Sequence, residues 1–219
     1  MRYRTVLFDL DGTLIDHFKT IHRCIGHTTA RMGLPSPSMA SVRSAVGASI
    51  ENILGHFVGP AQVPEALSIY LPYWDATLLD GAKLLPGALE SLEKLCGAGT
   101  QCAVLTNKRG VSARLLCEHL GLLPHLAVVF GNKDTPWLKP APELTSHVLQ
   151  HLHSTAAESC YVGDSPYDLA TAVAGGLNFY GVTTGTHSDA ELREAGATMV
   201  YSTLIAAVDA LSAPKISVS

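Results

Sequence analysis

The sequence contains no long hydrophobic run. Although 47% of its 219 residues are hydrophobic, no stretch approaches the roughly 20 consecutive apolar residues that a membrane-spanning helix requires. The N-terminal segment MRYRTVLFDLDG has a short apolar run that ends in acidic residues, which is not the pattern of a secretory signal. We therefore expect a cytoplasmic protein that does not engage a membrane.

Charge and cysteine are also scarce. Only 16% of the residues are charged, and the formal net charge of −4 leaves no basic excess to attract nucleic acid. The five cysteines are scattered and odd in number, and none belongs to a CxxC pair, so reduced thiols are expected rather than a disulfide framework. The apolar content is ample for a globular core of one or two domains.

Outside residues 17–83, short apolar strands alternate with amphipathic helices. We predict strands at residues 4–9, 101–105, 127–130, 159–162, 179–182 and 198–201. Helices are predicted at 111–120, 142–152, 166–174, 189–195 and 204–211, together with one that has Pro86 in its first turn and ends near Gly97. Repeated strand–helix units predict the α/β class, a parallel sheet with helices on both faces.

Residues 17–83 have helical spacing and no strand signal. The expected helices are 18–32, a second capped by Ser38, a third capped by Ser49, and one over 64–79 that Pro72 should kink or break. We therefore divide the chain into a core of residues 1–16 and 84–219 and a small all-helical insert of residues 17–83. Residues 212–219 are expected to form a frayed tail.

The segment VLFDLDG, residues 6–12, carries an apolar run directly into two aspartates. Asp9 and Asp11 are two positions apart, and such residues point to the same face of a strand. Two like charges in one small volume repel each other, and a cation or a proton normally holds them together. For an Asp-x-Asp-Gly pattern alone, an ordinary Asp-Gly turn with solvated carboxylates would be the better interpretation.

Polar residues follow three further predicted strands. Thr106 and Asn107 follow the second strand, Lys139 lies in the loop after the third, and Asp164 follows the fourth, with Asp168 one helical turn later. Each alone has a structural explanation, such as a strand-end cap, a helix cap or a solvated loop lysine. Ligands of parallel sheets bind beyond the carboxyl ends of the strands, and Mg²⁺ prefers oxygen ligands. Together these residues predict a site for a hard cation and a phosphate.

Four segments in this order resemble the four motifs of the haloacid dehalogenase-like hydrolase superfamily: DLDGTL at 9–14, LTN at 105–107, LKPAP at 138–142 and VGDSPYD at 162–168. TNK at 106–108, GVTTG at 181–185 and the position of the helical insert are similar to the phosphoglycolate phosphatase branch. The resemblance implies a Rossmann-like core, and it identifies the helical insert with the family's mobile cap.

The resemblance also implies a role for each motif residue. Asp9 would be the nucleophile that forms an aspartyl-phosphate, and Asp11 would be the general acid and base. A haloalkanoate dehalogenase of this superfamily does not use the second aspartate, so its presence favours phosphate chemistry. Asp9, Asp164 and the backbone carbonyl of Asp11 would bind Mg²⁺, the expected cofactor.

The remaining motif residues would bind the phosphoryl group. The expected phosphate-binding residues are Gly12, Thr106, Asn107 and Lys139. Thr106 and Lys139 would also act in catalysis, because they would hold the phosphoryl oxygens in the transition state. Asp168 would orient Lys139 or the waters of the metal.

The expected activity is Mg²⁺-dependent hydrolysis of a small phosphomonoester, with 2-phosphoglycolate as the leading candidate, by a monomer or a homodimer. The alternatives are a sugar-phosphate phosphatase, a pyrophosphatase, a phosphomutase and a non-catalytic phosphate-binding module. Mutases that resemble this chain carry a cap arginine shortly after a Val-Gly pair, and none follows Val46-Gly47. Non-catalytic members usually lose a motif aspartate, and all are present here.

The residues that would recognise the leaving group are less well defined. The resemblance places His17 at the catalytic cleft, together with the segment Gly47, Ala48, Ser49 and Ile50. The carboxylate of a glycolate leaving group would need a donor from the insert. His17, Arg23 and Arg43 are the candidates.

Overall fold

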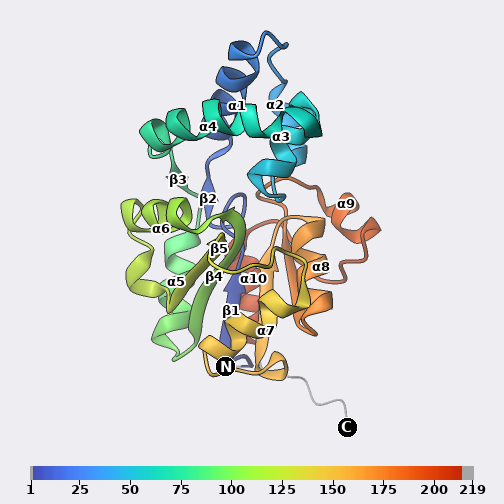
Figure 1. The fold of residues 1–219 in the computed structure, drawn as a ribbon. Helices are drawn as coiled ribbons and strands as arrows, with labels where there is room; N and C mark the ends of the chain where they lie inside the picture. The colour runs from blue at the N-terminus through green and yellow to red at the C-terminus, as the bar shows by residue number, and fades with distance from the viewer. Residues whose placement is uncertain (1, 214–219) are drawn as a thin grey trace.

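The computed structural model describes residues 2–213, and a six-stranded parallel sheet forms its centre (Figure 1). The strand order is β5-β4-β1-β6-β7-β8. The strands are β1 (Thr5–Phe8), β4 (Gln101–Arg109), β5 (Val128–Asn132), β6 (Ser159–Gly163), β7 (Asn178–Val182) and β8 (Val200–Tyr201). The predicted α/β class is confirmed.

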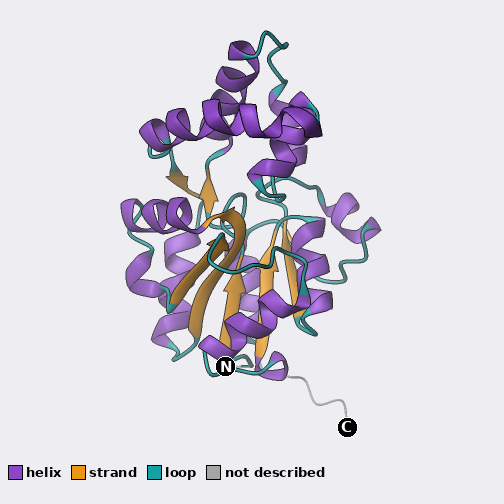
Figure 2. Cartoon of the chain, viewed as in Figure 1, coloured by secondary structure: helices purple, strands orange, loops and turns teal. Residues whose placement is uncertain are grey.

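Strand β1 lies inside the sheet and is apolar on both faces. Val6 is in register with Cys102 of β4 and Cys160 of β6, and every residue of β1 is buried. Val6 and Phe8 pack into one apolar cluster and Leu7 into another, so both faces need a cover of helices (Figure 2). One cover consists of α5 (Ala88–Gly97), α6 (Gly110–His119) and α10 (Leu204–Ser212), and the other of α7 (Pro142–His151), α8 (Pro166–Ala174) and α9 (Asp189–Glu194).

The helical insert lies beyond the carboxyl ends of the sheet strands, at the top of Figure 1. Its helices are α1 (Phe18–Arg31), α2 (Met39–Ala45), α3 (Ile50–Val58) and α4 (Val63–Thr77). The side chains of Ser38 and Ser49 accept hydrogen bonds from the N–H groups of Ser41 and Asn52, so both predicted caps are present. None of the described helices is long and apolar enough to cross a membrane.

Two short strands that the sequence analysis did not predict join the insert to the core. β2 (Ile15–Asp16) and β3 (Lys83–Leu84) pair antiparallel, with Ile15 opposite Leu84. The expectation that residues 17–83 contain no strand is therefore wrong at Lys83. Strands of two residues are too short to show an alternating pattern, so periodicity could not predict them.

Three other predicted details differ from the structure. Pro72 lies inside α4 without breaking it, because packing of the buried face can offset one lost hydrogen bond. Pro86 precedes α5 instead of occupying its first turn, since Gly87, at φ 78°, is the N-cap. β4 extends to Arg109, beyond its predicted end. Of the tail expected to fray, Ser212 ends α10, and residues 214–219 lie outside the described residues.

Candidate active site

Lys139 lies at the centre of the site, close to the carboxyl end of β1. Its Nζ is 2.8 Å from Asp9 Oδ1 and 2.6 Å from Asp168 Oδ1, and it donates to the Tyr161 hydroxyl oxygen at 3.1 Å. Burial alone would lower the pKa of this lysine, but Asp168 and Asp9 outweigh burial and hold that pKa well above its ordinary range. The side chain is therefore a permanent buried cation.

Asp9, Asp164 and Asp168 form a buried carboxylate cluster around this cation. Each offers an oxygen within 4.8 Å of the others. Burial raises the pKa of Asp9 to about 6, against the opposing effect of Lys139, and it raises the pKa of Asp164 to about 8 with the help of the neighbouring carboxylates. The raised pKa values show that one ammonium does not offset the burial and mutual repulsion of three carboxyl groups, and their oxygen atoms are the donors that fit a divalent cation.

Asp168 is occupied by the protein itself. Its Oδ2 accepts hydrogen bonds from the N–H of Asp164 at 3.1 Å, the N–H of Ser165 at 3.0 Å and the Ser165 hydroxyl at 2.6 Å. The reciprocal bonds between Ser165 and Asp168 form a capping box at the start of α8. Its other oxygen accepts from Lys139 at 2.6 Å, and the expected role of Asp168 in orienting Lys139 or the waters of the metal stays a prediction.

Asp164 is held by two threonines that the sequence analysis did not select. Thr13 donates to Oδ1 at 3.0 Å, and Thr186 donates to Oδ2 through its N–H at 2.7 Å and its hydroxyl at 2.9 Å. A Cβ on Gly12 would lie 2.5 Å from Oδ2, and one on Gly185 would overlap it. Thr13 belongs to the DLDGTL segment and Thr186 follows GVTTG, which is the signal that could have identified them.

Gly12 forms a turn beside Asp164. Its φ of 89° lies in the region that favours glycine. Its N–H donates to the Ile15 carbonyl at 2.8 Å, and its carbonyl accepts from the Thr184 hydroxyl at 2.7 Å. The amide of Gly12 is therefore already engaged, and phosphate binding by Gly12 stays a prediction.

Asp11 is paired with Lys108, the last residue of the TNK segment, for which no role was predicted. Lys108 Nζ lies 2.7 Å from Asp11 Oδ2 and 4.8 Å from the centre of the Trp74 ring. The other oxygen, Oδ1, is buried 3.9 Å from His17 Nδ1, and neither atom has a hydrogen bond within the described residues. The second aspartate of the motif thus faces one cation directly.

β4 contributes Thr106 and Asn107 to the site that contains Asp9 and Asp11. Asn107 Oδ1 accepts from the N–H of Lys139 at 2.9 Å, and its Nδ2 donates to the Gly47 carbonyl at 2.9 Å. Asn107 therefore joins the Lys139 loop and the helical insert to the sheet. Both ends of its amide are occupied, so phosphate binding by Asn107 stays a prediction.

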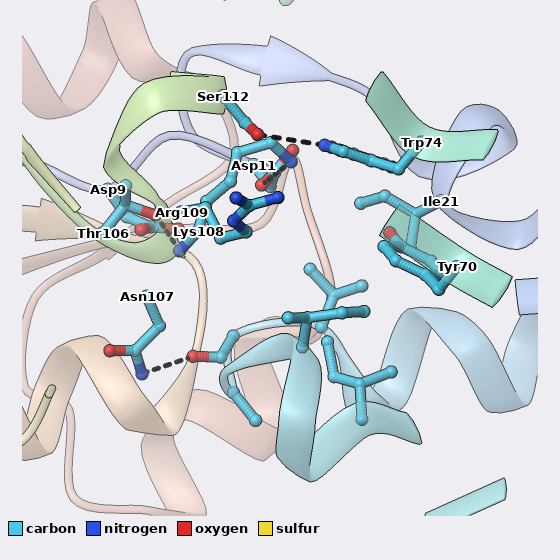
Figure 3. A pocket seen from close by; sticks show the side chains of 15 residues that line it. Asp9, Asp11, Ile21, Tyr70, Trp74, Thr106, Asn107, Lys108, Arg109 and Ser112 are labelled. Atoms are coloured by element: carbon cyan, nitrogen blue, oxygen red, sulfur yellow. Dashed lines mark hydrogen bonds and ion pairs between the residues drawn. The ribbon is translucent and has the colours of Figure 1, made fainter. Parts of the chain in front are cut away.

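A pocket lies between the sheet and the helical insert (Figure 3). It contains about 540 Å³ of space, part of it open to solvent. Asp9, Asp11, Thr106 and Asn107 line its core side. The insert contributes Ile21, Val46, Gly47, Ala48, Ile50, Ile53, Tyr70 and Trp74. Three residues of the segment expected to recognise the leaving group are thus in the lining, whereas the side chain of Ser49 caps α3.

The three donors expected from the insert lie elsewhere. His17 Nε2 is 2.6 Å from the backbone carbonyl that follows α4, and burial lowers the pKa of His17 to about 4, with Lys108 as a smaller cause. Arg23 pairs with Asp80 at the surface. Arg43 donates to the Gly185 carbonyl at 2.5 Å. None of the three is in the pocket lining, so none is placed to bind a carboxylate there.

Comparison with known proteins identifies the class of this site. The sequence model of the haloacid dehalogenase-like hydrolases matches residues 6–182, and the chain belongs to that family. A 5'-nucleotidase of Pseudomonas aeruginosa is 33% identical over 196 residues, 88% of each chain. A phosphoglycolate phosphatase of Yersinia pseudotuberculosis is 30% identical over 189 residues, 83% of this chain and 82% of the relative.

A solved structure agrees with this membership. A putative haloacid dehalogenase-like hydrolase from Bacteroides fragilis superposes with a TM-score of 0.87 at 25% identity, covering 92% of this chain and 98% of that one. Within the family, the chain lies in the phosphoglycolate phosphatase-like branch, as its motifs indicated. It is an enzyme of the phosphoric monoester hydrolase class.

Proposed function

We propose that the protein hydrolyses a small phosphomonoester through a covalent phosphate on Asp9, with Mg²⁺ as its cofactor. The observation that carries this proposal is a single pocket lined by the Asp9 and Asp11 carboxylates, with Asp9 Oδ1 2.8 Å from the Lys139 ammonium. Lysine pairing fixes the orientation of Asp9 and leaves its Oδ2 without a hydrogen bond among the described residues. That oxygen is the proposed nucleophile.

In the first half-reaction, Asp9 Oδ2 attacks phosphorus and the bond from phosphorus to the ester oxygen breaks. Asp11 gives its proton to the departing alkoxide. In the second half-reaction, Asp11 takes a proton from water, the water oxygen attacks phosphorus, and phosphate leaves with Asp9 restored. Lys108, 2.7 Å from Asp11 Oδ2, holds that carboxyl group in place between the two steps.

Asp9, Asp164 and the Asp11 backbone carbonyl are the proposed ligands of Mg²⁺, which when bound would offset the repulsion between the Asp9 carboxylate and the phosphate that it attacks. The hydrogen bonds from Thr13 and Thr186 orient Asp164 for this purpose. Thr106 and Lys139 are the proposed donors to the phosphoryl oxygens.

The helical insert, residues 17–83, is proposed to act as a cap on a core formed by residues 1–16 and 84–219. Several contacts cross between the two parts. Trp74 Nε1 donates to the Ser112 hydroxyl at 3.0 Å, and Lys133 pairs with Glu51 at 2.8 Å. A closed cap excludes water while the covalent phosphate forms, and the paired β2 and β3 are where the two parts connect.

The proposed substrates are small phosphorylated metabolites rather than nucleic acid or membrane components, and the proposed setting is the cytoplasm, as a monomer or homodimer. 2-Phosphoglycolate is the leading candidate from the sequence motifs, and the Yersinia relative is named a phosphoglycolate phosphatase. The name of the Pseudomonas relative adds nucleoside 5'-monophosphates. Sugar phosphates and pyrophosphate are the remaining alternatives as substrates, whereas membership of the phosphoric monoester hydrolase class argues against a phosphomutase reaction and against non-catalytic phosphate binding.

The test is phosphate release from a panel of these compounds, with Mg²⁺ and with excess chelator. Asp9→Asn should abolish turnover while circular dichroism shows an intact fold. Asp209→Asn, a change in an exposed pair with Lys94, is the matched control and should keep activity. Full turnover in chelator would contradict the metal requirement. Higher kcat/KM on a hexose phosphate than on 2-phosphoglycolate would refute that substrate but not the phosphatase class.

A further inference from the structure

The pocket extends beyond the carboxylates into a chamber with two unlike walls (Figure 3). Figure 3 shows Asp9 and Thr106 at one end, Lys108 and Arg109 next, and Ile21, Tyr70 and Trp74 at the other end. We call this far end the leaving-group chamber and define it by Ile21, Ile53, Tyr70, Trp74, Lys108 and Arg109. A substrate whose phosphate meets Asp9 must place its leaving group there.

The wall from the insert is aromatic and apolar. The Tyr70 and Trp74 rings are stacked with their centres 5.5 Å apart and an angle of 17° between their planes. The indole N–H of Trp74 is already satisfied by Ser112, and Lys108 Nζ lies 4.8 Å from the centre of the Trp74 ring. Among the described residues, no charged side chain of the insert lines the pocket.

The opposite wall carries an arginine, Arg109, in which one guanidinium nitrogen forms an ion pair but no hydrogen bond among the described residues. Arg109 Nη1 is buried and has no hydrogen bond within the described part of the chain. The same Nη1 forms an ion pair with Asp75 Oδ1 at 3.6 Å, and the Asp75 side chain is 59% exposed. Lys108, in contrast, is already bonded to Asp11. At 3.6 Å the Asp75 carboxylate is too far for a hydrogen bond, so a ligand that supplies an acceptor to the Arg109 guanidinium gains a charge-assisted hydrogen bond.

We propose that the leaving-group chamber binds a flat aromatic group that carries a hydrogen-bond acceptor on its edge, with Arg109 as the donor and the Tyr70–Trp74 wall as the packing surface. This inference rests on the proposed function and refines its substrate class. Stacked or edge-on aromatic contacts add to the burial of apolar area. A glycolate leaving group has two carbons and no ring, so it would leave that wall uncovered.

Nucleoside 5'-monophosphates and simple aryl phosphates both offer a flat aromatic group, and only the first also carries an acceptor on its edge, so the substrates of the test separate the two. kcat/KM is measured with Mg²⁺ for uridine 5'-monophosphate, phenyl phosphate, 2-phosphoglycolate and acetyl phosphate. We expect at least one aromatic substrate to exceed 2-phosphoglycolate by tenfold or more. Uridine 5'-monophosphate above phenyl phosphate indicates a nucleoside, because phenol offers no edge acceptor. Phenyl phosphate above uridine 5'-monophosphate would overturn the edge acceptor. Equal or better turnover of 2-phosphoglycolate overturns the inference.

Arg109→Gln tests the donor. We expect the ratio of KM for uridine 5'-monophosphate to KM for acetyl phosphate to rise about 10- to 100-fold, the range of a hydrogen bond to a charged group. Arg109→Lys should recover part of that loss. Arg23→Gln, which removes an exposed cation of the insert, is the matched control and should leave the ratio unchanged. An unchanged ratio in Arg109→Gln overturns the role of the arginine.

Calorimetric titration of Asp9→Asn with the same compounds separates this inference from the proposed chemistry, because binding needs no turnover. Tighter binding of the aromatic compound than of 2-phosphoglycolate supports the chamber even if wild-type protein hydrolyses neither. The phosphatase mechanism is refuted separately, by a lack of phosphate release from every compound of the full panel in the presence of Mg²⁺. Tighter binding of 2-phosphoglycolate, or no binding of either aromatic compound, overturns the chamber's assignment whatever the enzyme hydrolyses.

Discussion

Replacing Lys139 with methionine is expected to destabilise the metal-free protein strongly, although the two side chains have similar length. The side chain of Lys139 is 0% exposed, and its ammonium lies 2.8 Å from Asp9 and 2.6 Å from Asp168. Methionine fills the space of the lysine stem and removes only the charge and its donors. The loss in stability therefore measures how much the buried carboxylates depend on this cation.

The magnitude follows from the burial of the whole cluster. Asp9, Asp164 and Asp168 offer oxygens within 4.8 Å of one another, and Lys139 is the cation that contacts two of them. Removing one partner of a buried ion pair costs about 3–5 kcal/mol. At about 2–4 °C per kcal/mol for a chain of this size, the melting temperature should fall by roughly 6–20 °C.

The assay is thermal unfolding in chelator at neutral pH, repeated with Mg²⁺. Added Mg²⁺ should recover part of the loss, because a second cation then faces the same carboxylates. Lys94→Met is the matched control, since Lys94 is 51% exposed and its pair with Asp209 should be worth less than about 1 kcal/mol. A Lys139→Met protein that melts within 2 °C of the wild type in chelator would refute the reasoning.

Three further predictions follow from the site and its surroundings. Asp11→Asn should slow turnover by ~10²–10⁴-fold even at saturating Mg²⁺, and near-normal rates there would rule out general acid–base catalysis by Asp11. Gly185→Ala should raise the Mg²⁺ concentration for half-maximal activity at least about tenfold, because its Cβ would overlap the Asp164 carboxylate. Burial opposes a low pKa at Asp134, but the hydrogen bonds from Arg114 and a backbone amide outweigh it and place that pKa below the ordinary 3.8. The stability lost in Asp134→Asn, read by urea unfolding, should therefore be constant from pH 8 to 5 and shrink only below about pH 4; a change between pH 8 and 5 would contradict this assignment.

The core of the fold was predictable because, in a parallel sheet, the place of each segment along the chain indicates where it lies in the sheet. Apolar strands such as β1 must lie inside, and each strand's polar successor must lie at the same edge. Asp9, Lys139 and Asp164 were placed together on that basis, and the structure brings all three within one cluster. The pair β2 and β3 escaped prediction because two residues do not define a period.

The residues that hold these side chains in place were harder to predict from the sequence. Asp168 could be expected near Lys139 because it begins the helix after Asp164. Thr186 could not, because it comes from a loop whose position depends on how β7 and the segment after it pack. A threonine in a loop carries no pattern of its own, and only its contact with Asp164 gives it a role.

The residues of the leaving-group chamber were also hard to predict from the sequence, for a different reason. Tyr70 and Trp74 are four residues apart in α4, so the sequence places them on one face of a helix but does not say what that face covers. Their neighbour Lys108 is separated from its partner Asp11 by 97 positions, and it meets Trp74 only because the insert docks over β4. The rule that polar residues after parallel strands lie at one edge of the sheet says nothing about residues beyond that edge. The leaving group that the insert recognises therefore depends on how α1, α3 and α4 pack against the core. Substitutions at Tyr70 or Trp74 should change substrate preference while leaving the carboxylate cluster in place.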